Sequence, residues 1–208
     1  MSQPKAVIFD IGNVLIEWNP ERYFDQVIGQ EQRERMFSEV DIHGMMERID
    51  AGAPFAETVA EMAGENSKWH DAILHIRDHW TDVASPAIDH SVRLLRALKD
   101  NNVPVFALTN FGVQNFPLSE AKYSFLGEFD RRYISGELGL IKPDPQIYAI
   151  VEADTGLAPE NLLFTDDRED NITAANVRGW KTHLFDGPEG WAQTLVSYGL
   201  LDPAEAGL

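Results

Sequence analysis

The feature that most constrains the fold is a series of short, almost wholly apolar runs separated by longer helical patterns. Runs of this kind are typical of strands buried on both faces of a parallel sheet. The runs lie at 6–9, 103–108, 133–134, 162–164 and 182–185, and the helical patterns between or after them at 87–99, 145–154, 171–177 and 189–198. This alternation predicts an α/β fold with a Rossmann-like parallel sheet.

One long segment, residues 17–86, does not follow the alternation. Helical patterns dominate it, with Asn19-Pro20 as a typical helix start, and no strand run is visible. Helices are predicted near 21–28, 31–40, 43–49, 55–62 and 68–80. We therefore predict an all-helical cap domain at 17–86, inserted into an α/β core made of residues 1–16 and 87–208. The C-terminal residues 202–208 are expected to be frayed.

Composition narrows the classes of function. The 17 Lys and Arg against 34 Asp and Glu give a net charge of −17, which disfavours a nucleic acid or an anionic membrane as partner. The absence of cysteine excludes disulfides, thiolate metal sites and cysteine nucleophiles. No signal layout or membrane-length apolar run is visible, so we expect a cytoplasmic protein. The sequence does not predict its oligomeric state.

Polar residues gather where the predicted strands end, the edge at which open parallel sheets bind ligands. They are Asp10, Gly12, Thr109, Asn110, Lys142, Asp166, Asp167 and Asp170. Any one of these aspartates alone is ordinarily a helix cap or turn residue. Several carboxylates converging at one edge would repel one another unless a cation lay between them, and oxygen ligands without imidazole or thiolate suit Mg²⁺.

Across from such a metal, Lys142 and the Thr109 hydroxyl can hold an anion. An aspartate fixed beside the metal and facing that anion site, Asp10, is a credible nucleophile. The combination predicts phosphoryl transfer through an aspartyl intermediate.

Four motifs together resemble the haloacid dehalogenase-like hydrolase superfamily, most of whose members are phosphatases. They are Phe9-Asp10-Ile11-Gly12-Asn13-Val14-Leu15, Leu108-Thr109-Asn110, Leu140-Ile141-Lys142-Pro143-Asp144-Pro145 and Phe164-Thr165-Asp166-Asp167-Arg168-Glu169-Asp170. The helical insertion is similar to that family's mobile helical cap. The resemblance implies a sheet of order 5-4-1-2-3 and hydrolysis of a small-molecule phosphate ester with Mg²⁺ as cofactor.

The resemblance also implies a role for each motif residue near the metal. Asp10 would be the nucleophile and a metal ligand, the Gly12 backbone carbonyl a second ligand and Asp166 a third. Asp167 and Asp170 would orient water ligands and the motif lysine.

The transferring phosphoryl group would be held by Thr109, the Asn110 backbone and Lys142.

The sequence departs from the family pattern at Gly12, where most of these phosphatases have an aspartate that protonates the leaving alcohol. A phosphatase would then need a leaving group that departs unaided, or a donor from elsewhere, for which Glu17 and His43 are candidates. The Asp-x-Gly-Asn motif and the segment 19–23 resemble a subgroup of glucose-1-phosphate phosphatases, which makes a sugar phosphate a candidate substrate.

Two alternatives remain open. In a metal-independent 2-haloacid dehalogenase, Asp10 would attack carbon and halide would leave without a proton, but the acidic pair Asp166-Asp167 would then have nothing to neutralise it. In a catalytically weak binding or regulatory protein the site would be idle, although the intact Asp10, Lys142 and Asp166 argue against this.

Overall fold

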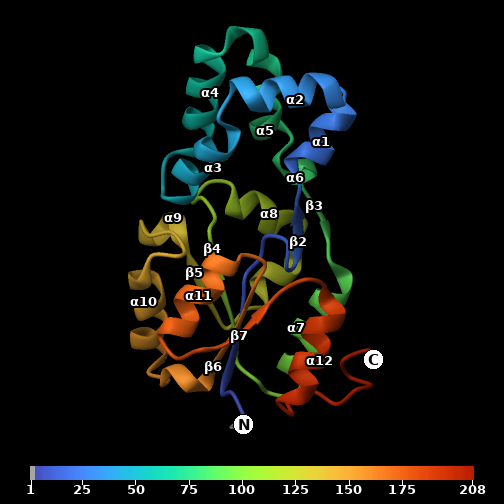
Figure 1. Cartoon of the computed structure of the whole chain (residues 1–208), viewed down its shortest axis with the longest axis vertical. Coiled ribbons are helices and arrows are strands. Elements are labelled where there is room, and N and C mark those ends of the chain that lie inside the picture. The colour runs from blue at the N-terminus through green and yellow to red at the C-terminus, as the bar shows by residue number, and fades with distance from the viewer. Residues whose placement is uncertain (1–2) are drawn as a thin grey trace.

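The computed structural model describes residues 3–208 as a parallel α/β sheet with a group of helices at one end (Figure 1). Met1 and Ser2, assigned above to the core, lie outside the described residues. The sheet strands are β1 (Ala6–Phe9), β4 (Val105–Thr109), β5 (Arg131–Ile134), β6 (Leu162–Asp166) and β7 (Lys181–Leu184). All neighbouring pairs are parallel, in the order β5-β4-β1-β6-β7. Numbered 1 to 5 in chain order, these strands lie 3-2-1-4-5, which is the predicted order read from the other edge.

Helices cover both faces of the sheet because the strand side chains are apolar on both. Along β1, Val7 and Phe9 face one core and Ala6 and Ile8 the other, and all four are fully buried. The first core includes α7 (Asp89–Asp100) and α12 (Pro188–Ser197), and the second includes α10 (Pro145–Thr155) and α11 (Glu169–Val177). The predicted α/β class is confirmed.

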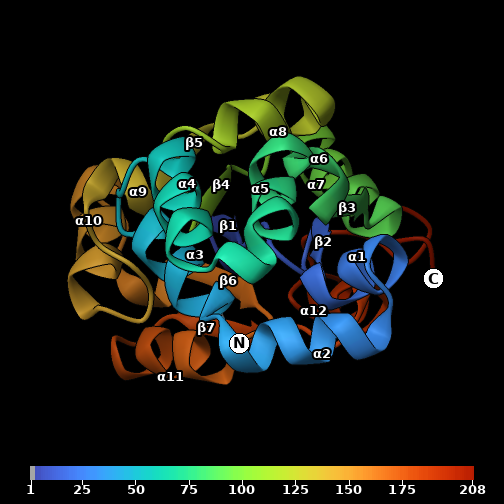
Figure 2. The same cartoon turned by 90° about the horizontal axis from the view of Figure 1, so that it is seen from above.

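A second group of helices follows the first strand. It comprises α1 (Pro20–Val27), α2 (Gln30–Glu39), α3 (Ile42–Asp50), α4 (Phe55–Glu65), the 3-10 helix η1 (Ser67–Trp69), α5 (His70–Asp78) and α6 (Trp80–Val83). We call residues 20–83 the helical segment. Figure 1 shows it gathered at one end of the molecule, and the view from above in Figure 2 shows its helices lying over the sheet. Side chains of Asn19 and Asp41 cap α1 and α3 by accepting from backbone N–H groups.

The prediction that 17–86 contains no strand is wrong. Two short strands, β2 (Ile16–Trp18) and β3 (Ala84–Ala87), pair antiparallel where the chain enters and leaves the helical segment. Each also crosses one of the predicted domain boundaries. Strands of three or four residues are too short to show an alternation of apolar and polar residues. Pro86 also lacks the backbone N–H that a strand residue normally donates, so the sequence of β3 argues against a strand.

The remaining elements lie in the connections: α8 (Phe116–Lys122), η2 (Ser124–Gly127), α9 (Ser135–Leu138) and η3 (Pro159–Asn161). The expectation of a frayed C-terminus is also wrong, because Leu201 and Ala206 are buried and the Ala206 carbonyl lies 2.8 Å from His90 Nε2. Within residues 3–208, no helix combines the length and apolar character that crossing a bilayer requires.

Packing of α12 on the central strand should be a large contribution to stability. Trp191 is fully buried, and its ring meets Phe9 edge-on at 5.6 Å between centroids. We expect Trp191→Ala to lower the free energy of unfolding by about 3–5 kcal/mol because it leaves a cavity in the core. Urea denaturation measures this. The control, Val177→Ala at a side chain that is 85% exposed, should change it by about 0.5 kcal/mol or less.

Candidate active site

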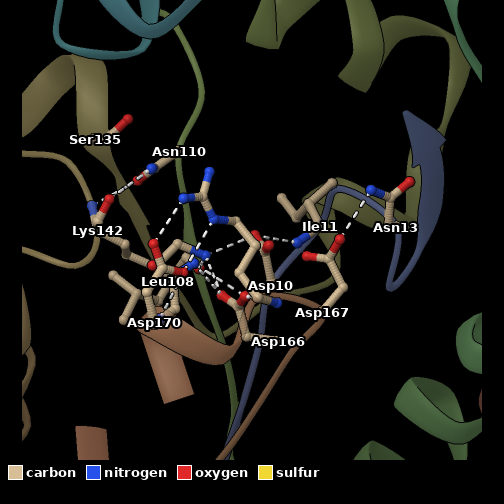
Figure 3. A network of polar contacts seen from close by, with 12 residues as sticks. Asp10, Ile11, Asn13, Leu108, Asn110, Ser135, Lys142, Asp166, Asp167 and Asp170 are labelled. Carbon is tan, nitrogen blue, oxygen red and sulfur yellow. Dashed lines mark hydrogen bonds and ion pairs between the residues drawn. The ribbon is translucent and has the colours of Figure 1, made fainter. Parts of the chain in front are cut away.

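The predicted site residues from neighbouring strands meet at the carboxyl edge of the sheet. Asp10 directly follows β1, and its backbone N–H donates to the Thr165 carbonyl of β6 at 2.9 Å. Asp166 ends β6, and Thr109 ends β4 on the other side of β1. All three predicted residues are buried, with Asp166 wholly inaccessible and Asp10 only 7% exposed. Figure 3 shows Asp10 and Asp166 close together.

Lys142 joins the two aspartates. Its Nζ lies 2.9 Å from Asp10 Oδ1 and 2.6 Å from Asp166 Oδ2, and donates to the Leu108 carbonyl at 2.9 Å. Burial alone would lower the pKa of this ammonium, but Asp10 and Asp166 outweigh that effect and the pKa is raised above its usual value. The charged form of Lys142 is therefore favoured, and three acceptors fix its position.

The side chain of Asn110 holds the lysine backbone in place. Its Oδ1 accepts from Lys142 N at 2.7 Å and its Nδ2 donates to Lys142 O at 3.0 Å (Figure 3). Asn110 thus clamps the loop that delivers the lysine, a side-chain contact additional to the backbone role predicted for it.

Asn171 is a site residue that the sequence analysis missed. Its Nδ2 lies 3.0 Å from both carboxylate oxygens of Asp166, and Arg168 N donates to Asp166 Oδ1 at 2.8 Å. Asn171 belongs to the first turn of α11, which starts at Glu169 directly after the strand end. That placement was the available signal, since a first-turn side chain can reach back toward the preceding strand.

The two remaining acidic residues of the fourth motif have different surroundings. Asp167 accepts a hydrogen bond from Asn13 Nδ2 at 2.9 Å, which ties the first motif to the fourth. Asp170 was expected to help orient Lys142, but its carboxylate instead pairs with Arg168, at 2.7 and 3.1 Å. Because the Asp170 carboxylate binds this nearby guanidinium, Asp170 does not contact Lys142 in the structure.

Three carboxylates form a group that fits a divalent cation. Asp10, Asp166 and Asp167 each offer one oxygen, and these oxygens lie within 4.8 Å of one another. The pKa of Asp10 is raised to about 7, chiefly by burial and also by the charges of Asp166 and Asp167, against the opposing charge of Lys142. Burial also raises the pKa of Asp167. Such clustered oxygen donors, costly to leave unneutralised, suit Mg²⁺.

Asp10 lines a cavity at this edge, and its two carboxylate oxygens have different surroundings. Oδ1 accepts from Ile11 N at 2.7 Å and faces Lys142, whereas Oδ2 takes part in neither contact. The cavity has a volume of about 630 Å³, and Gly12 lines it beside Asp10. A Cβ built on Gly12 would meet nothing within 4 Å, so the position has room for a larger residue.

The helical segment and the strand before it form the opposite wall. Side chains on this wall include Trp18, Asp41, His43, Glu47, Asp50 and Trp80. His43, Glu47 and Asp50 recur at the spacing of one helix face, so α3 presents one face to the cavity.

Asp50, at the last position of α3, was not predicted. It is mostly covered, and burial together with the charge of Asp10 raises the pKa of its carboxyl to about 7. Among residues 3–208, no hydrogen bond or ion pair engages that carboxylate. The donors considered from sequence differ from it: Glu17 is paired with Arg22, and the His43 side chain is 65% exposed.

Comparison with known proteins agrees with this geometry. The sequence model of the haloacid dehalogenase-like hydrolases matches residues 4–178. An enolase-phosphatase of Persephonella marina is 32% identical over 107 residues, which are 50% of this chain and 47% of that protein, so the chain spans about half its length. A D-ribitol-5-phosphate phosphatase of Bacteroides thetaiotaomicron is 22% identical over 203 residues, covering 92% of this chain and 97% of that one.

Solved structures show the same fold. A haloacid dehalogenase family enzyme of Bacteroides thetaiotaomicron has a TM-score of 0.72 at 25% identity and covers 93% of this chain and 99% of its own. The same wild-type enzyme in complex with magnesium and inorganic phosphate gives a TM-score of 0.69 at 25% identity, with 92% and 98% covered. The L-2-haloacid dehalogenase of Xanthobacter autotrophicus shares the fold at 18% identity, with a TM-score of 0.60 and 98% and 86% covered.

The burial of Asp50 predicts a pH-dependent stability. Between its ordinary pKa of 3.8 and the folded value of about 7, the folded protein holds a proton that the unfolded chain has lost. The free energy of unfolding therefore falls as pH rises through this window. Asn cannot ionise, so Asp50→Asn should stabilise the metal-free protein by about 1–3 kcal/mol at about pH 8.

Urea denaturation at a series of pH values measures this difference, which should vanish near pH 4. The control is Asp71→Asn, whose carboxylate is wholly exposed and should give no such trend. A gain for Asp50→Asn that is the same at all pH values would show that ionisation is not its cause.

Proposed function

Because this chain belongs to the haloacid dehalogenase-like hydrolase family, we propose that it is a phosphatase that transfers a phosphoryl group to Asp10 and then to water. One observation carries the proposal: a cluster of three carboxylates and one lysine, buried except for the half-buried Asp167, adjoins a cavity of substrate size that Asp10 lines. The nucleophile, the anion-binding cation and the metal-binding oxygens are thus all at one point.

The proposed cofactor is Mg²⁺. Asp10, Asp166 and the Gly12 backbone carbonyl would bind it, with Asp167 holding a water ligand. When bound, the ion neutralises the carboxylates and the charge that develops on the phosphoryl oxygens. The related Bacteroides enzyme, crystallised with magnesium and phosphate, supports this assignment.

The remaining roles in phosphoryl transfer are proposed for residues of the chain itself. Asp10 Oδ2, which lies outside the contacts with Ile11 and Lys142, is the oxygen proposed to attack phosphorus. Lys142, the Thr109 hydroxyl and the Asn110 backbone would hold the phosphoryl oxygens. Asn110 keeps the lysine loop fixed while they do so, because its side chain binds both the backbone N–H and the backbone carbonyl of Lys142.

The helical segment, within the predicted unit 17–86, is proposed to act as a cap over this chemistry. It supplies one wall of the cavity, and its position over the sheet supports a role in excluding bulk water during transfer.

The proposed substrate is a small polyol or sugar phosphate. The helical wall carries the carboxylates of Glu47 and Asp50 and the aromatic rings of Trp18 and Trp80; no Lys or Arg among residues 3–208 lines the cavity from that side. Such a wall repels a second anionic group and suits hydroxyls and C–H faces. Similarity to a D-ribitol-5-phosphate phosphatase supports the same class.

The dehalogenase alternative is less well supported. That reaction uses no metal, and it would leave the Asp10, Asp166 and Asp167 group with only Lys142 to balance it. The dehalogenase resemblance is one of fold alone.

A substrate screen tests the proposal. We expect phosphate release from polyol and sugar phosphates that requires Mg²⁺ and stops with EDTA, because the carboxylate cluster needs a counter-charge. The panel should contain these esters, 4-nitrophenyl phosphate, dicarboxylate-bearing phosphates and 2-haloacids, each with and without Mg²⁺. Metal-free halide release would establish the dehalogenase instead, and no turnover of any compound would favour a binding protein.

A substitution of the nucleophile tests the covalent step. Asp10→Asn should reduce turnover by at least about 10³-fold, since the amide cannot attack phosphorus. Phosphate release and thermal unfolding are measured together, with Asp71→Asn as the surface control. A folded Asp10→Asn protein with near-normal turnover would contradict the mechanism.

A further inference from the structure

The proposed phosphatase lacks a proton donor where its family usually has one. An alkoxide leaving group departs poorly without a proton, and general-acid catalysis contributes about 10²–10⁴-fold. Gly12, two residues after the nucleophile, has no side chain to supply that proton. For an alkyl ester, whose alkoxide does not depart unaided, we therefore look for the donor among the other groups that line the same cavity.

We propose that Asp50 of the helical segment is this donor: it protonates the leaving oxygen and later accepts the proton of the attacking water. The inference rests on the proposed phosphatase function. Three observations support it: the position of Asp50 in the cavity, the freedom of its carboxylate, and the way its backbone is fixed to the core.

Asp50 shares the cavity with Asp10 and Gly12 but comes from the opposite wall. Its carboxylate has no hydrogen bond or ion pair among residues 3–208, so it is available to a ligand. A mostly covered acid left unpaired is costly, which is typical of a functional position. A pKa of about 7 agrees with this, because the group can both give and take a proton near neutral pH.

The end of α3 is fixed to the core at the strand ends. Ser135 Oγ, buried after β5, donates to the Asp50 carbonyl at 2.6 Å and accepts from Phe111 N at 2.9 Å. The backbones approach closely here: a Cβ on Gly112 would lie 3.1 Å from the Ile49 carbonyl oxygen, and one on Gly52, at φ +108°, 3.0 Å from a core carbonyl. Asp50 is thus held at a fixed place relative to the phosphate site.

The other carboxylates of the helical wall are less suited. Glu17 is engaged by Arg22, and Asp41 accepts from Gly44 N as the cap of α3. Glu47 lies one turn before Asp50 on the same helix but is exposed. Asp50 is the acid on this wall that is both largely covered and unpaired.

The two half-reactions balance through Asp50. In the first, Asp10 Oδ2 bonds to phosphorus, the bond from phosphorus to the ester oxygen breaks, and that oxygen takes the electron pair and the Asp50 proton to leave as the alcohol. In the second, water bonds to phosphorus and gives a proton to the Asp50 carboxylate as the phosphorus–Asp10 bond breaks. Inorganic phosphate, ionised Asp10 and protonated Asp50 result.

Leaving-group dependence tests this assignment. We expect Asp50→Asn to lower kcat/KM for glycerol 1-phosphate and sorbitol 6-phosphate by about 10²–10⁴-fold. For 4-nitrophenyl phosphate, whose phenolate leaves without a proton, kcat/KM should change little and also reports that the variant is folded. Its kcat should fall, because the amide introduced by Asp50→Asn cannot accept the proton of the water that attacks the phosphorylated Asp10. The control, Asp71→Asn, removes a wholly exposed carboxylate from another helix of the helical segment and should keep the wild-type dependence on the leaving group.

A second variant adds a rescue. Gly12→Asp in the Asp50→Asn protein should restore part of the alkyl phosphate activity, because the position has room for the side chain.

Equal losses of kcat/KM on aryl and alkyl phosphates, no loss on either, or a wild-type enzyme that hydrolyses only the aryl ester would overturn the role of Asp50. Failure of the proposed function is seen separately, as a wild-type protein that releases no phosphate even from 4-nitrophenyl phosphate; the inference would fall with it.

Discussion

The contact on which the site depends is the ammonium of Lys142 between the carboxylates of Asp10 and Asp166. All three groups are buried, so each charge has lost most of its hydration and is stabilised by the others. Removing one member would leave an uncompensated buried charge, a change that typically costs about 3–5 kcal/mol. Asp167 adds a third carboxylate beside the pair, so with all groups ionised three negative charges face one positive charge, a net of −2. The contacts with Lys142 hold the motifs together, and the excess negative charge of the same cluster favours binding of a divalent cation.

The sheet order brings these charges together. Because β1 lies between β4 and β6, chain connections leave it in opposite directions and a crevice opens at its carboxyl end. Asp10 from the first strand, Lys142 from the loop clamped by Asn110, and Asp166 from β6 reach that crevice from widely separated parts of the chain. Asn171 and Asn13 then fix the carboxylates of the fourth motif from two sides. The polar network is a consequence of the topology, and a different strand order would disperse it.

The features that could be predicted from the sequence are those encoded by residues close together in the chain. The apolar run of β1 and the motif around Asp10 are local signals. Both the strand and the position of Asp10 at the carboxyl ends of the strands were therefore predicted. Strands β2 and β3 were missed because three or four residues, one of them Pro86, show no alternation. Asp170 was expected at the lysine, but that expectation did not weigh the guanidinium of Arg168 two residues away.

Asp50 illustrates a limit of a different kind. On its own, an aspartate at the end of an amphipathic helix reads as a solvated residue, and its setting arises only when Ser135 and the loop at Gly112 receive the end of α3. That contact joins residues far apart in sequence, so no local pattern contains it. The donor candidates visible in the sequence, Glu17 and His43, lie close to the first motif or carry an imidazole, whereas tertiary packing leaves Asp50 covered and unpaired.

A proton donor on the helical segment has a consequence for how catalysis is timed. When the donor stands two residues after the nucleophile, the acid and the nucleophile belong to one rigid loop, whether or not a cap has closed. With Asp50 as donor, the acid reaches the leaving oxygen only while the end of α3 is docked against the loops after β4 and β5. Docking would also complete the cavity wall that we propose excludes bulk water. Proton delivery and water exclusion are then set by the same contact, so a phosphate ester bound beneath an undocked segment would meet the nucleophile without the acid needed to release its alcohol.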